Sequence, residues 1–292
     1  LSIWETKHKK ISDYLSKWEV DVLPKRFNHW IENQAVKNQT EFDWFLLDKI
    51  DVKSLKGAVV KFKEDGSFLL KGDNPKDDQW IISAATSKKK ITGIRIEALT
   101  DTSMKKKGPG RAENGNFSLS DLRVFVEPLD GTSKKVAVKL INPKATFEQN
   151  KDGLSVASSI DDNKRTSGWA IDHGGIGKDQ AASFEFASSV SHASGVKLTI
   201  EMDFFTNTKH TIGRPRFSIT SQAKPIKLNG TSMKASVANL LKEVEQIQDF
   251  SKLNDAKHAE LVAAYRFVDS EWNRLKGIIQ SHLANKPKPK MT

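Results

Sequence analysis

The chain has 292 residues, no cysteine and a formal net charge of +11, and 37% of its residues are hydrophobic. This composition is typical of a folded globular protein, and the missing cysteines exclude disulfides, thiolate zinc sites and a cysteine nucleophile. No apolar run reaches the roughly 18 residues that a membrane span needs, so we expect no transmembrane segment. The chain begins at Leu1 without an initiator Met, which we interpret as a processed protein or a piece of a longer one.

Residues 1–40 are predicted to form an N-terminal helical segment. Ile11, Leu15, Trp18 and Val22 follow one another at spacings of 4, 3 and 4, which places them on one face of a helix. Pro24 should break or restart that helix, because proline lacks the amide hydrogen that a helix interior requires.

Residues 41–222 show the two-residue period of β-strands. Val196, Leu198, Ile200, Met202 and Phe204 alternate with polar residues, as in a strand with one buried face. A hairpin is predicted over residues 59–70, around an Asp-Gly turn. About ten short strands follow one another without a helical crossover between them. The segment is therefore expected to be an antiparallel, jelly-roll-like β-sandwich.

Residues 232–285 return to a helical pattern, and residues 286–292 are predicted to be a disordered basic tail. A heptad seam typical of a coiled coil is formed by Leu261, Tyr265, Val268, Trp272, Leu275 and Ile279. A lone helix cannot bury such a seam, so we expect these helices to pair with residues 1–40. The fold class is thus mainly β, with the terminal helices forming an antiparallel helical stalk.

The positive charge does not indicate a nucleic-acid-binding protein. Lysine runs occur at residues 88–90 and 105–107 and in the tail, but aromatic residues are not interleaved with them, as a single-strand stacking platform would require. We interpret these runs as solvated loops and expect no nucleic acid partner.

The segment GPGRAENGNF, residues 108–117, is the first candidate site. It lacks the spacing of a phosphate-binding P-loop and is not followed by a helical pattern. Arg111, Asn114 and Asn116 offer fixed donors and acceptors suited to hydroxyl or carboxylate groups. They either face a ligand or pin the loop to its own backbone. His210 and Arg214 complete the predicted ligand-binding set.

Asp161 and Asn163 form the second candidate site. Their hard oxygen atoms suit a structural calcium ion, whereas the alternative is a turn in which Asp and Asn bond their own backbone. No HExxH motif, GxSxG elbow or separated carboxylate pair is present, so we expect no catalytic site. Trp80 and Trp169 are expected in the core rather than as sugar-stacking platforms.

Two resemblances bear on function. Residues 156–169 run from a small apolar entry through an acidic turn to Thr166 and Trp169, and this resembles discoidin-type, galactose-binding-like jelly rolls. The segments 93–99, 108–117, 120–124, 161–169 and 210–220, in that order, resemble a β-sandwich module of large exported planctomycete proteins that also carry a cytochrome c domain. Asp162 and Pro215 depart from these patterns, which usually have Gly and an aromatic residue there.

The resemblance implies a non-catalytic module, periplasmic or extracellular, that binds carbohydrate or a cell surface. A polysaccharide or glycan would then be the ligand, and calcium the structural ion. Haem attachment is not implied, because the chain has no cysteine. The alternative is a structural spacer or protein-interaction module, which binds no small ligand and positions the neighbouring domains of a parent protein.

Overall fold

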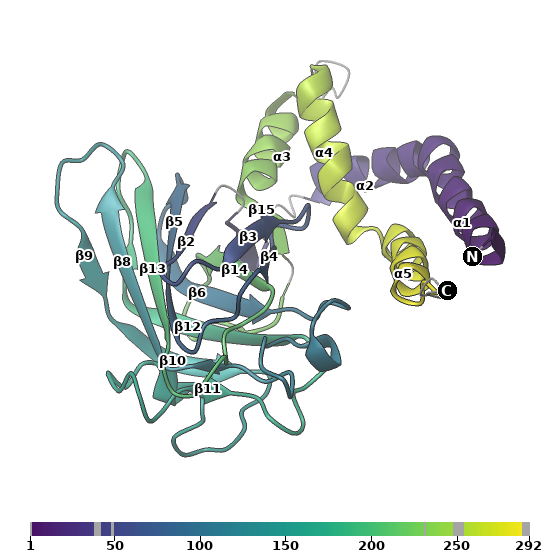
Figure 1. Ribbon diagram of the computed structural model, residues 1–292. Helices are drawn as coiled ribbons and strands as arrows, with labels where there is room; N and C mark the ends of the chain where they lie inside the picture. The colour runs from purple at the N-terminus through teal and green to yellow at the C-terminus, as the bar shows by residue number, and fades with distance from the viewer. Residues whose placement is uncertain (1, 38–41, 48–49, 231, 248–253, 288–292) are drawn as a thin grey trace. The chain divides into compact units, whose positions relative to one another are not determined.

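The computed structural model describes residues 2–37, 42–47, 50–230, 232–247 and 254–287 (Figure 1). Contacts between residues divide the chain into two compact units. One, the sandwich unit, comprises residues 42–235. The other, the helical unit, combines residues 1–41 with residues 236–292. The predicted basic tail lies outside the described residues from residue 288 onward.

The sandwich unit consists mainly of short strands. They are β1 (Trp44–Leu46), β2 (Ile50–Ser54), β3 (Val59–Phe62), β4 (Phe68–Lys71), β5 (Asp78–Thr86), β6 (Ile91–Ala98), β7 (Ser118–Leu119), β8 (Asp121–Pro128), β9 (Val136–Val138), β10 (Leu140–Ala145), β11 (Trp169–Ala170), β12 (Gln180–Val190), β13 (Val196–Phe204), β14 (Pro215–Thr220) and β15 (Ser232–Lys234). Two 3-10 turns, η1 (Lys105–Lys107) and η2 (Ala157–Ser159), interrupt the loops.

Two larger sheets form the sandwich (Figure 1). The five-stranded sheet has the order β2-β5-β13-β8-β9, and the six-stranded sheet has the order β10-β12-β6-β14-β1-β15. The pairings within both sheets are antiparallel except that of β1 with β15, so the prediction of an antiparallel β-sandwich with helices is confirmed. The predicted hairpin over residues 59–70 is formed by β3 and β4.

Aromatic side chains link the layers of the core. The Phe68 ring on β4 lies 6.4 Å from the Trp80 ring of the five-stranded sheet and 6.1 Å from the Phe217 ring of the six-stranded sheet. All three side chains are fully buried, and so is Trp169. The expectation that Trp80 and Trp169 belong to the core is confirmed, because neither ring is open to a ligand.

The sandwich unit extends beyond residue 222. The segment from Gln222 crosses the outer face of the six-stranded sheet, where Ile226 is buried and its amide donates to the Glu185 carboxylate over 3.0 Å. Strand β15 then pairs in parallel with β1 at the edge of the sheet. This return to the first strand is a long-range pairing that the local sequence pattern does not reveal.

The helical unit contains five helices among its described residues. They are α1 (Ser2–Asp21), α2 (Leu23–Lys37), α3 (Ala235–Ile247), α4 (Asp255–Val268) and α5 (Ser270–Ala284). The helical pattern restarts at Leu23, immediately before Pro24, as expected from the sequence. None of the described helices is long and apolar enough to cross a bilayer.

Helices α1 and α5 run antiparallel. The Trp4 indole donates to the backbone oxygen of His282 over 3.2 Å, and the Trp272 indole donates to the Glu19 carboxylate over 2.7 Å. The start of α1 therefore meets the end of α5, and the end of α1 meets the start of α5. These contacts join α1 to α5 within the helical unit, while the predicted antiparallel helical stalk stays a prediction.

The continuous heptad seam predicted from Leu261 to Ile279 is wrong at one point, because the helix breaks at Asp269. This residue is extended, with φ −74° and ψ 115°, and both ends α4 and caps α5 by accepting the Trp272 amide over 2.8 Å. Its buried carboxylate also accepts from Arg26 and Tyr265, each over 2.7 Å. Asp269 is not one of the seam residues, so the heptad spacing alone does not predict that the helix breaks there.

The contacts of Asp269 also shift the pKa values of Asp269 and Tyr265. Burial raises the pKa of the Asp269 carboxyl, but the hydrogen bonds from Tyr265, Trp272 and Arg26 outweigh burial and hold the pKa below its ordinary value. A carboxyl with a lowered pKa stabilises the fold above its ordinary pKa and loses that contribution as the pH falls through the lowered value. Burial, together with the bond to Asp269, raises the pKa of Tyr265 to about 12.

We expect Asp269→Ala to lower the free energy of unfolding by about 2 kcal/mol, because the change removes a helix cap and leaves a buried tyrosine hydroxyl without its acceptor. Asp269→Asn keeps an acceptor for the Trp272 amide and should cost less. Urea unfolding followed by helical circular dichroism measures both. Equal stability of Asp269→Ala and the wild type would show that the cap does not hold α4 and α5.

Candidate functional site

The loop over residues 108–117 folds tightly onto the sandwich. The Gly110 amide donates to the Gly115 oxygen over 2.9 Å, and the Gly115 amide donates to the Ala112 oxygen over 2.8 Å. A Cβ at Gly110 would lie 1.8 Å from the Asn116 backbone oxygen, so only glycine fits there. Gly115 has a φ of +84°, a region that favours glycine. The glycines thus close a compact turn.

The side chains of Asn114 and Asn116 bond the backbone of the sandwich unit. The Asn114 carboxamide oxygen accepts the Asn116 amide over 3.1 Å. Asn116 is buried, and its own side-chain oxygen accepts from the amides of Phe117 and Ile171 over 2.9 and 3.0 Å. The Asn116 side chain therefore holds the loop against the residue that follows β11. For Asn116 this favours the alternative in which the side chain pins the loop to the backbone rather than faces a ligand.

Arg111 and Arg214 also act within the fold. The Arg111 guanidinium donates to the backbone oxygens of Gly72 and Asp73 over 2.8 and 3.1 Å. Arg214 donates to Ser67, Thr100 and Asp65, and its bond to the Asp65 carboxylate measures 2.6 Å. The two guanidinium groups bond to different partners, and the Arg111 Nη1 is buried without a hydrogen-bond partner among the described residues.

His210 is half-buried, and its Nδ1 lies 2.6 Å from the backbone oxygen of Thr208. Its backbone oxygen accepts the Ser118 amide, which places His210 beside the same loop. The assignment of these five residues to ligand binding stays a prediction, but their hydrogen-bonding groups are mostly engaged within the sandwich.

Asp161 and Asn163 lie together in an exposed turn. The Asp161 carboxylate accepts the Asn163 amide and the Ser167 hydroxyl, each over 2.8 Å. The Asn163 side-chain oxygen accepts the amides of Arg165 and Thr166, each over 3.2 Å. Within the described residues no group of three or more His, Asp or Glu side chains is placed to hold a metal ion. These contacts fit a self-closing turn better than a calcium cage, which takes six to eight oxygen ligands.

A different surface brings polar and apolar groups together: the outer face of the five-stranded sheet. Strand register places three outward-pointing residues in each of four rows. The rows, in the order β5, β13 and β8, are Gln79, Asp203 and Asp121; Ile81, Glu201 and Arg123; Ser83, Thr199 and Phe125; and Ala85, Lys197 and Glu127. Successive side chains of a strand point to opposite faces. Leu198, Ile200 and Met202 of β13 are buried on the inner face, and this determines which residues point outward.

Arg123 is the centre of the ion pairs on this face. Its guanidinium contacts the carboxylates of Glu201 over 3.2 Å and Asp203 over 2.9 Å, and it also pairs with Asp121. Asp203 is fully buried and accepts a further bond from the Gln79 amide group over 2.6 Å. Burial raises the pKa of Asp121 despite the opposing charges of Arg123 and Lys164.

Apolar surface lies beside these charges. Phe125 and Ile81 are half-buried on the outer face, on either side of β13. The Lys135 ammonium lies 4.2 Å from the centre of the Phe125 ring and 3.3 Å from the Glu201 carboxylate. Arg123 and Glu201 retain 22% and 19% exposure of their side chains, so the outer face presents charged hydrogen-bonding groups and an aromatic ring to solvent.

The equivalent face of the six-stranded sheet is more enclosed. Arg95, at its centre, is 5% exposed, and it donates to the backbone oxygen of Leu228 over 3.3 Å in the segment that crosses the sheet. Glu185 and Ser218 on the same face are also buried. The outer face of the five-stranded sheet is therefore the more accessible of the two. The alternation of residues 196–204 could have identified it from the sequence, whereas its partners on β5 and β8 require the strand register.

No protein-family model and no curated protein matches the sequence. Two solved structures of variants of CBM29-2, described as probing ligand recognition by family 29 carbohydrate binding modules, are similar to the chain at 8% identity. The match to the first structure covers 62% of this chain and 89% of the chain in that structure, with a TM-score of 0.23. The match to the second covers 64% of this chain and 97% of the chain in that structure, with a TM-score of 0.24. Scores this low establish no shared function. The resemblance to planctomycete and discoidin-type modules stays a prediction.

We expect Asn116→Ala to lower the free energy of unfolding by about 2 kcal/mol, because two backbone amides lose their acceptor in a buried setting. Asn114→Ala removes a single local bond in a half-buried loop and should cost less than 1 kcal/mol. Chemical denaturation of both variants gives the comparison. An Asn116→Ala variant as stable as Asn114→Ala would contradict the pinned interpretation and return Asn116 to the ligand-facing alternative.

The contacts of the Asp161 turn predict that the thermal unfolding midpoint is the same in calcium and in a chelator, because each oxygen already accepts a bond within the turn. Differential scanning calorimetry in the two buffers tests this expectation. A midpoint raised by calcium in the wild type, but not in Asp161→Ala, would support the calcium alternative instead.

Proposed function

We propose that the sandwich unit is a non-catalytic carbohydrate-binding module whose ligand lies on the outer face of the five-stranded sheet. The observation that carries this proposal is the combination of partly exposed ion-paired groups at Arg123 and Glu201 with the half-buried ring of Phe125 on one sheet face. The family resemblance of the sequence also supports it, and implies a periplasmic or extracellular location.

Sugar rings present two kinds of surface, and the outer face offers a group for each. Hydroxyl groups both donate and accept hydrogen bonds, and they are matched by carboxylates that accept and guanidinium groups that donate. Bonds to charged groups are roughly twice as strong as neutral ones. The C–H face of a sugar ring is apolar and packs on aromatic or aliphatic side chains such as Phe125 and Ile81. Burial of this surface would add to affinity.

The charges of the outer face favour an uncharged polysaccharide. Lys164 lies 3.2 Å from Asp203, and Lys197 lies 2.9 Å from Glu127. Arg123 and Lys135 are likewise paired with carboxylates of the face. An acidic sugar would have to compete with these internal partners, despite the net positive charge of the chain. A glycan without acidic groups can form hydrogen bonds with these ion-paired side chains without displacing their partners.

A structural or protein-interaction role is the second candidate. The antiparallel contact of α1 with α5 supports it, because Trp4 and His282 bring the two ends of the described chain together. Adjacent ends suit a module inserted between neighbouring domains. Light scattering of a variant that lacks α4 and α5 would test it: an unchanged oligomeric state and an unchanged sandwich would argue against an assembly role of these helices.

We expect Arg123→Ala and Phe125→Ala each to weaken binding to a neutral polysaccharide by about tenfold or more, since each removes a group that faces the ligand. Affinity electrophoresis through gels containing neutral β-glucans and mannans, and through gels containing acidic polysaccharides, measures the effect. Circular dichroism of each variant checks that the sandwich still folds.

Matched controls come from β3, which lies outside the five-stranded sheet. Lys61→Ala removes an exposed cation, and Phe62→Ala removes an aromatic ring that is 56% exposed. Neither should change mobility in the polysaccharide gels. If the wild type is retarded by no neutral polysaccharide, or if Phe62→Ala lowers affinity as much as Phe125→Ala, the proposed face is wrong.

A further inference from the structure

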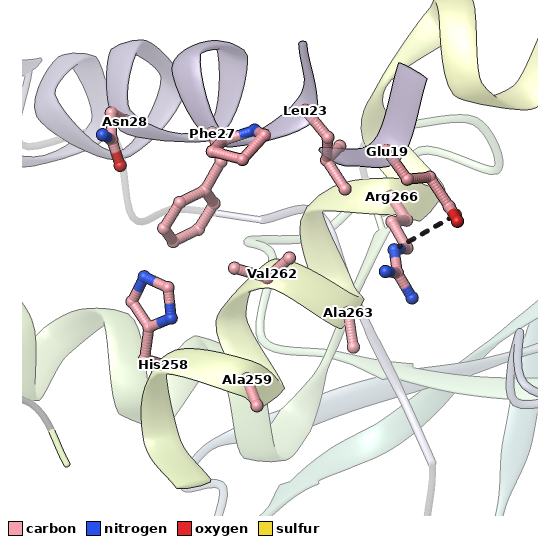
Figure 2. A pocket seen from close by; sticks show the side chains of 10 residues that line it. Glu19, Leu23, Phe27, Asn28, His258, Ala259, Val262, Ala263 and Arg266 are labelled. Carbon is pink, nitrogen blue, oxygen red and sulfur yellow. Dashed lines mark ion pairs between the residues drawn. The ribbon is translucent and has the colours of Figure 1, made fainter. Parts of the chain in front are cut away.

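An apolar groove of about 360 Å³ lies within the helical unit, between α4 and the stretch from the end of α1 into α2 (Figure 2). Leu23 and Phe27 form its floor and are each 2% exposed. Its walls are formed by Pro24, Ala259, Val262 and Ala263. The volume falls in the range of small-molecule pockets, about 300 to 1,000 Å³. We refer to this feature as the helical groove.

Helical spacing explains how the groove is formed. Glu19, Leu23 and Phe27 follow one another at intervals of four, and so do His258, Val262 and Arg266 on the facing helix. The rows run in opposite directions, because Glu19 pairs with Arg266 at one end and the Phe27 ring meets the His258 ring at 5.3 Å at the other (Figure 2). Eight residues of helix correspond to a length of about 12 Å.

The small side chains of Ala259 and Ala263 leave the groove open. Both are exposed on α4, directly beside the apolar floor. A larger residue at either position would occupy the groove itself. Because Leu23 and Phe27 are almost fully covered, the apolar surface that stays open in the groove belongs to Pro24, Ala259, Val262 and Ala263.

The Arg266 guanidinium lies at one end of the groove, and not all of its hydrogen-bond donors have an acceptor. Its Nε is shielded from solvent and has no hydrogen-bond partner among the described residues. The nearest carboxylate oxygen, on Glu19, is 3.6 Å away, which is too far for a hydrogen bond, and that oxygen already accepts the Trp272 indole over 2.7 Å. A second anion could therefore bind the guanidinium without breaking a hydrogen bond.

We propose that the helical groove binds an amphiphilic carboxylate of medium chain length, with its alkyl chain against Pro24, Val262 and the two alanines of α4, and its carboxylate at Arg266. The apolar lining suits the alkyl chain, and guanidinium groups match the geometry of carboxylates. An alkyl chain of about 12 Å spans the groove between its two polar ends. This site is independent of what the sandwich unit binds.

Calorimetric titration of the full chain with sodium decanoate, below its micelle concentration, tests the proposal. Decanoate should bind at one site per chain, and 1-decanol, which lacks the charge, should bind at least fivefold more weakly. Arg266→Gln should weaken decanoate binding about tenfold, because it removes a charge-assisted bond. The affinity of Arg266→Gln for decanol should stay the same.

Ala259→Leu is the sharper variant, since leucine would fill the groove and is nearly as good a helix former as alanine. It should abolish decanoate binding. Ala256→Leu is the matched control, because Ala256 is exposed on α4 but does not line the groove, and it should bind decanoate like the wild type. Thermal unfolding confirms that both variants fold.

The proposal is overturned if decanoate does not bind at millimolar concentration or if Ala259→Leu binds it like the wild type. Light scattering tests the competing possibility that a helix of a second copy occupies the groove. If the groove instead receives a helix of a second copy, the wild type will be an oligomer that Ala259→Leu dissociates, and decanoate will not bind. Equal binding of decanoate and decanol would also contradict the role of Arg266.

Discussion

The strict alternation of β13 between an apolar and a polar face is the constraint on which the sandwich depends. Leu198, Ile200 and Met202 are fully buried on its inner face. Because the side-chain period of a strand is two, a shift of one residue would send the apolar set to solvent and the charged set into the core. The register with β5 and β8 is therefore fixed, and so is the set of residues that reaches the outer face of the five-stranded sheet.

That constraint links the fold to the proposed function. Arg123 on β8 faces Glu201 on β13, and Gln79 on β5 faces Asp203 on β13, because the strands pair in this register. No single strand carries the site. The groups meet only when three strands from distant parts of the sequence lie side by side. The helical groove follows the same logic, since facing rows at intervals of four leave a channel where one helix contributes alanine.

Local patterns in the sequence predict most of the architecture but less of the candidate sites. The period of residues 196–204, the hairpin around Asp65 and the restart of the helix near Pro24 are each determined within a few residues, and the structure contains all three. The break at Asp269 combines a local cap on the Trp272 amide with a hydrogen bond from the distant Arg26, and the spacing of the apolar seam residues reveals neither. The same holds for Asn116, whose polar side chain suggested a ligand but accepts the distant amide of Ile171.

The proposed location of the ligand is tested most directly by a heteronuclear NMR titration of the full chain with a neutral oligosaccharide from whichever polysaccharide retards it. We expect the chemical-shift changes to concentrate on the amides and side chains of β5, β8 and β13, with the largest at Arg123, Phe125 and Glu201. Changes that centre on the loop over residues 108–117, with the five-stranded sheet unaffected, would contradict it.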